Sequence, residues 1–140
     1  MIRLATADRL AIGELLARAA WAYDEGRLDV MEACLTEDAR MEVHIAGIDP
    51  MPAHEGRAAV LALIGGAIEA QDDQRRHVIS NVFFESEDTD RAVVVSNLTL
   101  LATTPAATNV MSAGLYRDTV VRTREGWRFC DRRLSLDRPY

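Results

Sequence analysis

Apolar and polar residues follow two different periods along the chain, and the period changes near its middle. Through most of the first half, apolar residues recur three and four positions apart, the spacing that lines one face of a helix. In the second half, they follow the two-residue period of strands or form β-branched runs on both alternating faces. This pattern predicts helices first and a sheet after them.

Three helices and one short strand are expected before residue 71. The helical period is clearest ahead of Gly26, a residue type that commonly follows the last turn of a helix. A short segment that alternates apolar and polar residues lies between the second and third helices, and Gly47 and Pro50 end it in a loop. The expected helices span residues 8–25, 28–35 and 56–70, and the expected strand spans residues 41–45.

Four longer strands are expected after the third helix, over residues 75–85, 91–103, 109–124 and 127–136. Short connections between them predict antiparallel neighbours. Because several strands are apolar on both faces, each face of the sheet needs a cover. Helices would cover one face and a second subunit the other. The predicted fold is α+β, a cone of three N-terminal helices packed on a strongly curved, mainly antiparallel sheet that encloses a pocket.

Length and composition fit one globular domain over residues 1–140, because a chain of this length, with 49% apolar and 27% charged residues, can bury a sizeable core. The longest apolar run falls well short of the ~20 residues that cross a bilayer. The N-terminus lacks the apolar core of a secretory signal. We therefore expect a cytoplasmic protein with no membrane partner.

Cys34 and Cys130 are too few for a disulfide framework, and their spacing indicates no metal site.

The charged residues narrow the chemistry further. The net charge is −6 and the basic residues are scattered, so the basic stripe of a nucleic-acid binder is missing and no nucleic-acid partner is expected. All 16 basic residues are arginine, which excludes a lysine Schiff base or lysine general base. Proton transfer would have to rely on histidine, carboxylates or tyrosine.

Four segments carry a resemblance to a known family: Tyr-Asp-Glu-Gly-Arg at 23–27, Arg-His-Val-Ile-Ser-Asn-Val at 76–82, Gly-Leu-Tyr-Arg-Asp at 114–118 and Gly-Trp-Arg-Phe at 126–129. With the order of elements, they resemble the SnoaL-like branch of the nuclear transport factor 2-like superfamily. The resemblance implies a cystatin-like α+β barrel. It leaves the function open, because members include dehydratases, isomerases, cyclases, dehydrochlorinases and non-catalytic subunits.

Asp24 and His77 are the candidate catalytic residues. In scytalone dehydratase and lindane dehydrochlorinase, the resemblance implies that an aspartate near the end of the first helix and a histidine on the strand after the third helix act together, and Asp24 and His77 match them. A carboxylate bound to one ring nitrogen fixes the tautomer and raises the basicity of the other. The resemblance implies a cofactor-independent lyase or isomerase acting on a small, apolar, oxygenated substrate. The alternatives are a strand histidine with structural contacts only and a helix-terminal aspartate that caps a turn.

Tyr23, Asn97 and Arg133 are the candidate substrate-binding residues. Tyr23 matches a tyrosine that precedes the aspartate of the dehydratase, whose second histidine falls near Asn97. The lysine on the first helix of the dehydrochlorinase has no counterpart. Asn97 lies among apolar strand residues, and Arg133 follows Arg132 near the end of the last strand; these polar groups could bind or polarise an oxygen. The alternatives are core packing for Tyr23 and a structural hydrogen bond or surface ion pair for Asn97 and Arg133.

A second branch of the superfamily matches the C-terminal half. Residues 77–82, 96–98 and 128–137 resemble the small, or beta, subunit of aromatic-ring-hydroxylating dioxygenases, which is mainly structural and binds an iron-containing large subunit. A small-molecule binding module without turnover is a third possibility. Under the enzyme hypothesis we expect a homo-oligomer, most simply a two-fold dimer through the outer face of the sheet.

Overall fold

The computed structural model describes residues 3–140, and its helices lie where the apolar period places them. They are α1 (Thr6–Asp24), α2 (Leu28–Cys34) and α3 (Arg57–Glu69). Each begins and ends within two residues of its expected range, so the prediction of three N-terminal helices is confirmed. No helix in this part of the chain is long and apolar enough to cross a membrane.

The strands form one six-stranded mixed sheet in the order β2-β1-β6-β5-β4-β3. They are β1 (Leu35–Ile45), β2 (His54–Glu55), β3 (Gln74–Glu87), β4 (Arg91–Thr103), β5 (Thr108–Thr123) and β6 (Gly126–Leu136). Strands β3 to β6 pair as antiparallel neighbours, as predicted.

The prediction was wrong at the start of β1 and missed β2. The strand was expected to begin at residue 41, but residues 35–40 also belong to it, because β1 pairs in parallel with β6, beginning with Leu35 opposite Phe129. A strand far away in sequence supplies these hydrogen bonds, so the local pattern does not contain them. The two-residue β2 pairs with β1 through Met41 and His54 and is too short to show a period.

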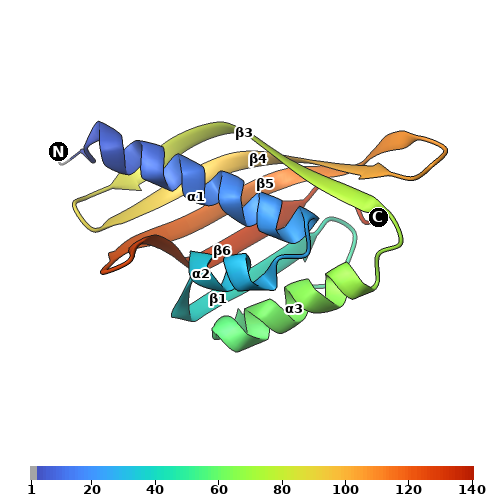
Figure 1. The fold of residues 1–140 in the computed structure, drawn as a ribbon, viewed down its shortest axis with the longest axis horizontal. Helices are drawn as coiled ribbons and strands as arrows, with labels where there is room; N and C mark the ends of the chain where they lie inside the picture. Colours follow the sequence, from blue (N-terminus) through green and yellow to red (C-terminus); the bar gives the residue numbers. More distant parts are fainter. Residues whose placement is uncertain (1–2) are drawn as a thin grey trace.

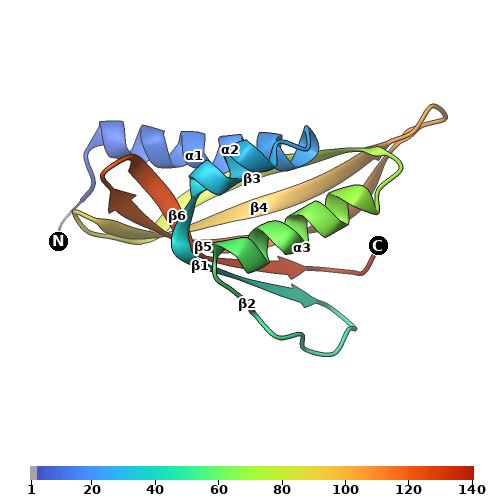
Figure 2. The same cartoon turned by 60° about the horizontal axis from the view of Figure 1, so that its bottom comes forward.

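The helices cover one face of the sheet, and the sheet bends around them. In Figures 1 and 2, α1 runs along the β3 side, while α3 lies beside β1 at the other end. Apolar side chains from both layers meet in the core, including Ile12 of α1, Val60 of α3 and Phe129 of β6, which are all fully buried. This arrangement confirms the predicted α+β cone.

The sheet has two local irregularities, a register shift in β3 and a close approach of two backbones at β5. The register of β3 against β4 shifts between Ser80 and Phe83, and Asn81 within this bulge has a φ of 55°. At Gly114 of β5, the neighbouring strand comes so close that a Cβ would lie 2.2 Å from the carbonyl oxygen of Ser135. Bulges and glycines of this kind produce the curvature that strongly bent sheets require.

We predict that Gly114→Ala destabilises the fold by about 1–3 kcal/mol, because the new methyl group would push β5 away from the β6 backbone. Gly13→Ala is the matched control. Gly13 is exposed on α1, and no other side chain lies within 4 Å of the place that an alanine methyl group would occupy, so alanine there should stabilise by about 0.5–1 kcal/mol. Urea unfolding of both variants measures the difference, and equal stabilities would contradict the role given to Gly114.

Candidate active site

A cavity of about 240 Å³ lies between the helices and the curved sheet. Its walls are mainly apolar, with Leu16 of α1, Ile64 of α3 and Leu134 of β6 among them. It is larger than the roughly 150 Å³ that accommodates a benzene ring. Its polar lining groups are two histidines, one arginine and all three tyrosines of the chain: His54, His77, Arg132, Tyr23, Tyr116 and Tyr140. The predicted pocket is therefore present and suits a small, largely apolar molecule with a few polar atoms.

Asp24 and His77 form a close pair at the edge of this cavity. Asp24 is the last residue of α1 and His77 lies on β3, and 2.6 Å separates His77 Nδ1 from Asp24 Oδ1. The backbone N–H of His77 donates to the other carboxylate oxygen at 2.9 Å. The side chains are only 9% and 6% exposed for His77 and Asp24, respectively. The contact expected from the sequence is thus present, and it fixes both the ring and the strand that carries it.

The direction of this pairing determines which ring nitrogen of His77 is available. An ionised carboxylate only accepts hydrogen bonds, so a proton shared with Asp24 resides on Nδ1 and leaves the lone pair on Nε2. His77 lines the cavity whereas Asp24 does not. Within residues 3–140, Nε2 has no hydrogen-bond partner and remains accessible to solvent. The available nitrogen is therefore the one that a bound molecule could reach.

Tyr23 lies directly against this pair and also lines the cavity. Its ring centroid is 4.3 Å from that of His77, and Gln71 Nε2 donates a hydrogen bond to its hydroxyl oxygen. Burial raises the pKa of the Tyr23 hydroxyl, so the phenol stays protonated at neutral pH. Because Gln71 supplies one proton to this oxygen, the hydroxyl's own proton remains free for an oxygen atom in the cavity.

A second polar group lies further along the sheet. Arg132 of β6 donates two hydrogen bonds to Asp118 of β5, at 2.9 Å from Nε and 3.1 Å from Nη2. Asp118 is fully buried, and burial raises the pKa of its carboxyl while the two bonds from Arg132 favour the ionised form. The guanidinium lies 4.4 Å from the ring centre of Tyr116 and 4.0 Å from that of Phe129. Burial raises the pKa of Tyr116 to about 12.

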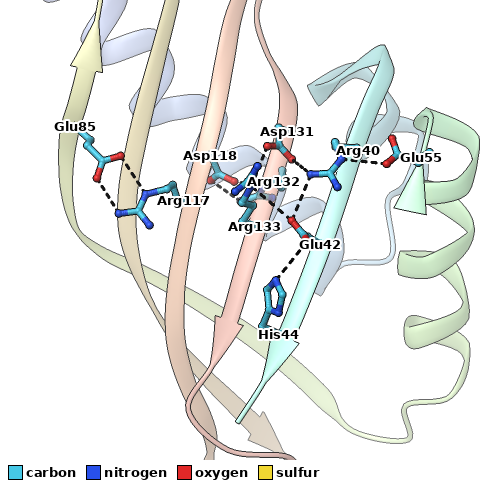
Figure 3. A network of polar contacts seen from close by, with 10 residues as sticks. All are labelled: Arg40, Glu42, His44, Glu55, Glu85, Arg117, Asp118, Asp131, Arg132 and Arg133. Atoms are coloured by element: carbon cyan, nitrogen blue, oxygen red, sulfur yellow. Dashed lines mark hydrogen bonds and ion pairs between the residues drawn. The ribbon is translucent and has the colours of Figure 1, made fainter. Parts of the chain in front are cut away.

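The structure places Asn97 and Arg133 away from the cavity, on the outer face of the sheet. Asn97 is exposed and lines a shallow depression near Ser80 and Gly114. Arg133 is paired with Asp131 at 3.2 Å and with Glu42 at 3.6 Å, within the outer-face network of Figure 3. Neither residue is positioned to contact a molecule held in the cavity, and the ion pair gives Arg133 a structural explanation.

The sequence analysis missed three polar lining residues, His54, Tyr116 and Tyr140, and it chose Arg133 as the substrate-binding residue where the structure has Arg132 in the lining. A signal existed for Arg132, because Leu134 and Leu136 are buried and the two-residue period puts Arg132 on their face and Arg133 on the other. Tyr116 is opposite Leu134 in the antiparallel register, which depends on a pairing that the sequence alone does not show. Residues 49–55 and 137–140 lie in or beside irregular segments, where no periodic signal could place His54 or Tyr140.

Metal ligands do not gather in this part of the chain. Among residues 3–140, no group of three or more histidine, cysteine, aspartate or glutamate side chains is arranged to hold a metal ion. Cys34 and Cys130 are both free thiols. The polar groups of the cavity are instead proton donors and acceptors.

A match to a family model identifies the group to which the chain is related. The model for the SnoaL-like domain matches residues 5–133, which is nearly the whole chain. The chain belongs to the SnoaL-like domain family. No curated protein matches the sequence significantly.

Solved structures of other proteins share this SnoaL-like fold. A nuclear transport factor 2-like protein with a cystatin-like fold from Novosphingobium aromaticivorans is 27% identical, with a TM-score of 0.80 over 93% of this chain and 82% of that one. A candidate scytalone dehydratase from the same organism is 21% identical, with a TM-score of 0.77 over 93% and 84% of the two chains. The beta subunit of a candidate aromatic-ring-hydroxylating dioxygenase, again from that organism, is 18% identical, with a TM-score of 0.78 over 96% and 91%. At identities this low, the last two show the fold alone.

We predict that Tyr116 weakens the fold at alkaline pH. An unfolded tyrosine ionises near pH 10 whereas Tyr116 ionises at about 12, so the folded state holds an extra proton between these values and loses stability as pH rises through them. Tyr116→Phe should remove part of this loss, on the order of 1–2 kcal/mol. Urea unfolding at pH values below and within this window measures it, with Tyr140→Phe, a change at an exposed phenol, as the control. The same pH dependence in wild type and Tyr116→Phe would contradict the desolvation of this phenol.

Proposed function

We propose that this SnoaL-like protein is a lyase or isomerase that moves a proton on a small, largely apolar, oxygenated molecule, using its own side chains and no cofactor. The observation that carries the proposal is the hydrogen bond between Asp24 and His77, with the second ring nitrogen open toward the cavity. A histidine oriented by a carboxylate is a base suited to neutral pH.

His77 Nε2 would remove a proton from a carbon next to a carbonyl group, and Asp24 would stabilise the imidazolium that forms. Tyr23 would donate a hydrogen bond to the oxygen on which negative charge develops, a role that its free hydroxyl proton permits. In an elimination, the electron pair forms a carbon–carbon double bond and the departing hydroxide takes the proton back from His77 to leave as water. In an isomerisation, the same proton returns to a different carbon.

The predicted effect of His77→Gln or Asp24→Asn is a loss of turnover of about 10²–10⁴-fold, the usual scale for general acid–base catalysis. Activity would be measured on a panel of β-hydroxy ketones and on 5-nitrobenzisoxazole, whose ring opens to a coloured product when a base removes one carbon-bound proton.

His44→Gln is the matched control, because His44 is exposed on the outer face of the sheet, where it lies near Glu42. It should leave the rate unchanged. Wild-type rates in both His77→Gln and Asp24→Asn would rule out the proposed base.

We also propose that the outer face of the sheet pairs with a second copy of the chain. Phe83 of β3 and Val110 of β5 are 55% and 65% exposed, and register places both on this face. The neighbouring charges are already paired within one chain, as with Arg117 and Glu85 at 2.8 Å, so they would not enter the interface as isolated ions. A two-fold dimer would cover these apolar side chains, and closed dimers are the commonest soluble assembly.

The same exposed residues favour one alternative, a beta subunit that covers this face with an iron-containing large subunit.

Light scattering of the purified protein should show a dimer, and Phe83→Asp should shift it toward monomer, because a charge would be buried without a partner. Leu10→Asp, at a 70% exposed position on α1, should leave the assembly unchanged. A monomeric wild type would overturn the dimer proposal, and co-elution with an iron–sulfur protein at fixed stoichiometry from the native host would favour the subunit.

A further inference from the structure

The buried pair of Arg132 and Asp118 presents an unusual donor to the cavity. Asp118 lies behind Arg132, outside the lining, and engages Nε and Nη2. Within residues 3–140, the remaining nitrogen, Nη1, has no hydrogen-bond partner and remains accessible to solvent. Arg132 is itself only 7% exposed and lines the cavity. The free N–H groups of Nη1 therefore open toward the space in which a molecule would bind.

The carboxylate of Asp118 cancels the charge of this donor. The pair as a whole is neutral, and it is buried where electrostatic interactions are poorly screened. The other ionic pair at the cavity is Asp24 with His77, which is negative while the imidazole is neutral. Arg75, two residues before His77 on β3, is bound to Asp73 at 2.6 Å and does not line the cavity. Among the described residues, Arg132 is the only arginine that lines the cavity, and Asp118 compensates it, so no lining guanidinium carries an uncompensated charge.

We propose that the cavity selects molecules whose oxygen atom at Arg132 is uncharged, such as a carbonyl or amide oxygen, and that Asp118 sets this preference by neutralising Arg132. A carboxylate at this position would add a second negative charge to a buried pair and lose its hydration. A neutral oxygen would accept a hydrogen bond from Nη1 without either cost. This inference names the substrate class of the cavity and rests on the proposed function for the view that the bound molecule is a substrate.

Tyr116 supports the same preference from the adjacent position. Its hydroxyl has no hydrogen-bond partner within the described chain and its ring lies against the guanidinium of Arg132. The phenol stays neutral at physiological pH and can donate to the same oxygen. Ser112 of β5 is in register with His77 of β3 through Leu100 of β4, which lies between them. Tyr116 is four residues further along β5, which corresponds to about 13 Å of strand. The bound molecule would thus be held at two points, with its reacting carbon at His77 and an uncharged oxygen at Arg132 and Tyr116.

Binding of two probes of nearly the same shape tests the preference. 2-Naphthamide and 2-naphthoate differ mainly in charge, and calorimetry at neutral pH gives both dissociation constants without any turnover. We expect 2-naphthamide to bind wild type at least about tenfold more tightly. Equal affinity, tighter binding of 2-naphthoate, or no binding of either probe at millimolar concentration would overturn the inference.

Asp118→Asn separates the specific role of the pair from the general cost of desolvating a charged ligand in an apolar cavity. It leaves Arg132 as an uncompensated cation, so the dissociation constant for 2-naphthoate should fall by about tenfold while that for 2-naphthamide changes by less than about threefold. An unchanged ratio of the two constants would overturn the role of Asp118.

The double variant Asp118→Leu/Arg132→Met covers the case in which Asp118→Asn does not fold, because replacing a whole buried ion pair by apolar residues is often tolerated. It should weaken 2-naphthamide binding by about tenfold through loss of the donor, and unchanged binding would contradict the inference. His44→Gln, on the outer face of the sheet, should leave both probe affinities within about threefold of wild type. The probe affinities are measured without turnover, so the probe preference and the loss of turnover in His77→Gln are independent results, and either proposal can fail without the other.

Discussion

The carboxylate of Asp24 is the contact on which both the fold and the candidate chemistry depend. One oxygen binds the ring of His77 and the other binds the backbone N–H of the same residue, so the carboxylate joins the end of α1 to β3. Gln74 adds a bond from its side chain to the carbonyl oxygen of Asp24. A buried carboxylate is costly unless its acceptor positions are used, and here they are used to fix a titratable ring beside a cavity. The same bonds that hold the helix to the sheet orient the imidazole.

The cavity combines two requirements that conflict in most protein interiors. Its apolar walls exclude water, while the polar groups among them must be paired or remain open to a ligand. Asp118 accepts hydrogen bonds from Arg132, and Gln71 donates one to the Tyr23 hydroxyl, so both polar side chains are partly paired. The groups left open include His77 Nε2, the proton of the Tyr23 hydroxyl, the Tyr116 hydroxyl and Arg132 Nη1. A pocket whose unpaired donors and acceptors all face inward is organised for a ligand more than for stability.

Membership of the SnoaL-like family determines the architecture and leaves the activity to individual side chains. The fold is shared with a candidate dehydratase and with a candidate dioxygenase beta subunit, and the same cone can serve as an enzyme or as a structural partner. The two proposed uses would depend on opposite faces of the sheet. An enzyme would use the inner face, where His77 and Arg132 lie, and a subunit would use the outer face, where Phe83 and Val110 are exposed.

The sequence by itself determined the helices, the four long antiparallel strands and, through family resemblance, the pairing of Asp24 with His77. Local periodicity is enough for the helices and strands, because it shows which positions of an element share a face, whichever element covers that face. Only the tertiary structure decided the parallel pairing of β1 with β6 and the side of the sheet on which each strand residue lies. Strand β4 is apolar on both faces, so the alternation could not show that Asn97 points outward. Alternation states that neighbours such as Arg132 and Arg133 face opposite ways, but which face becomes the inner one depends on where the helices pack, and that is a long-range property of the whole chain.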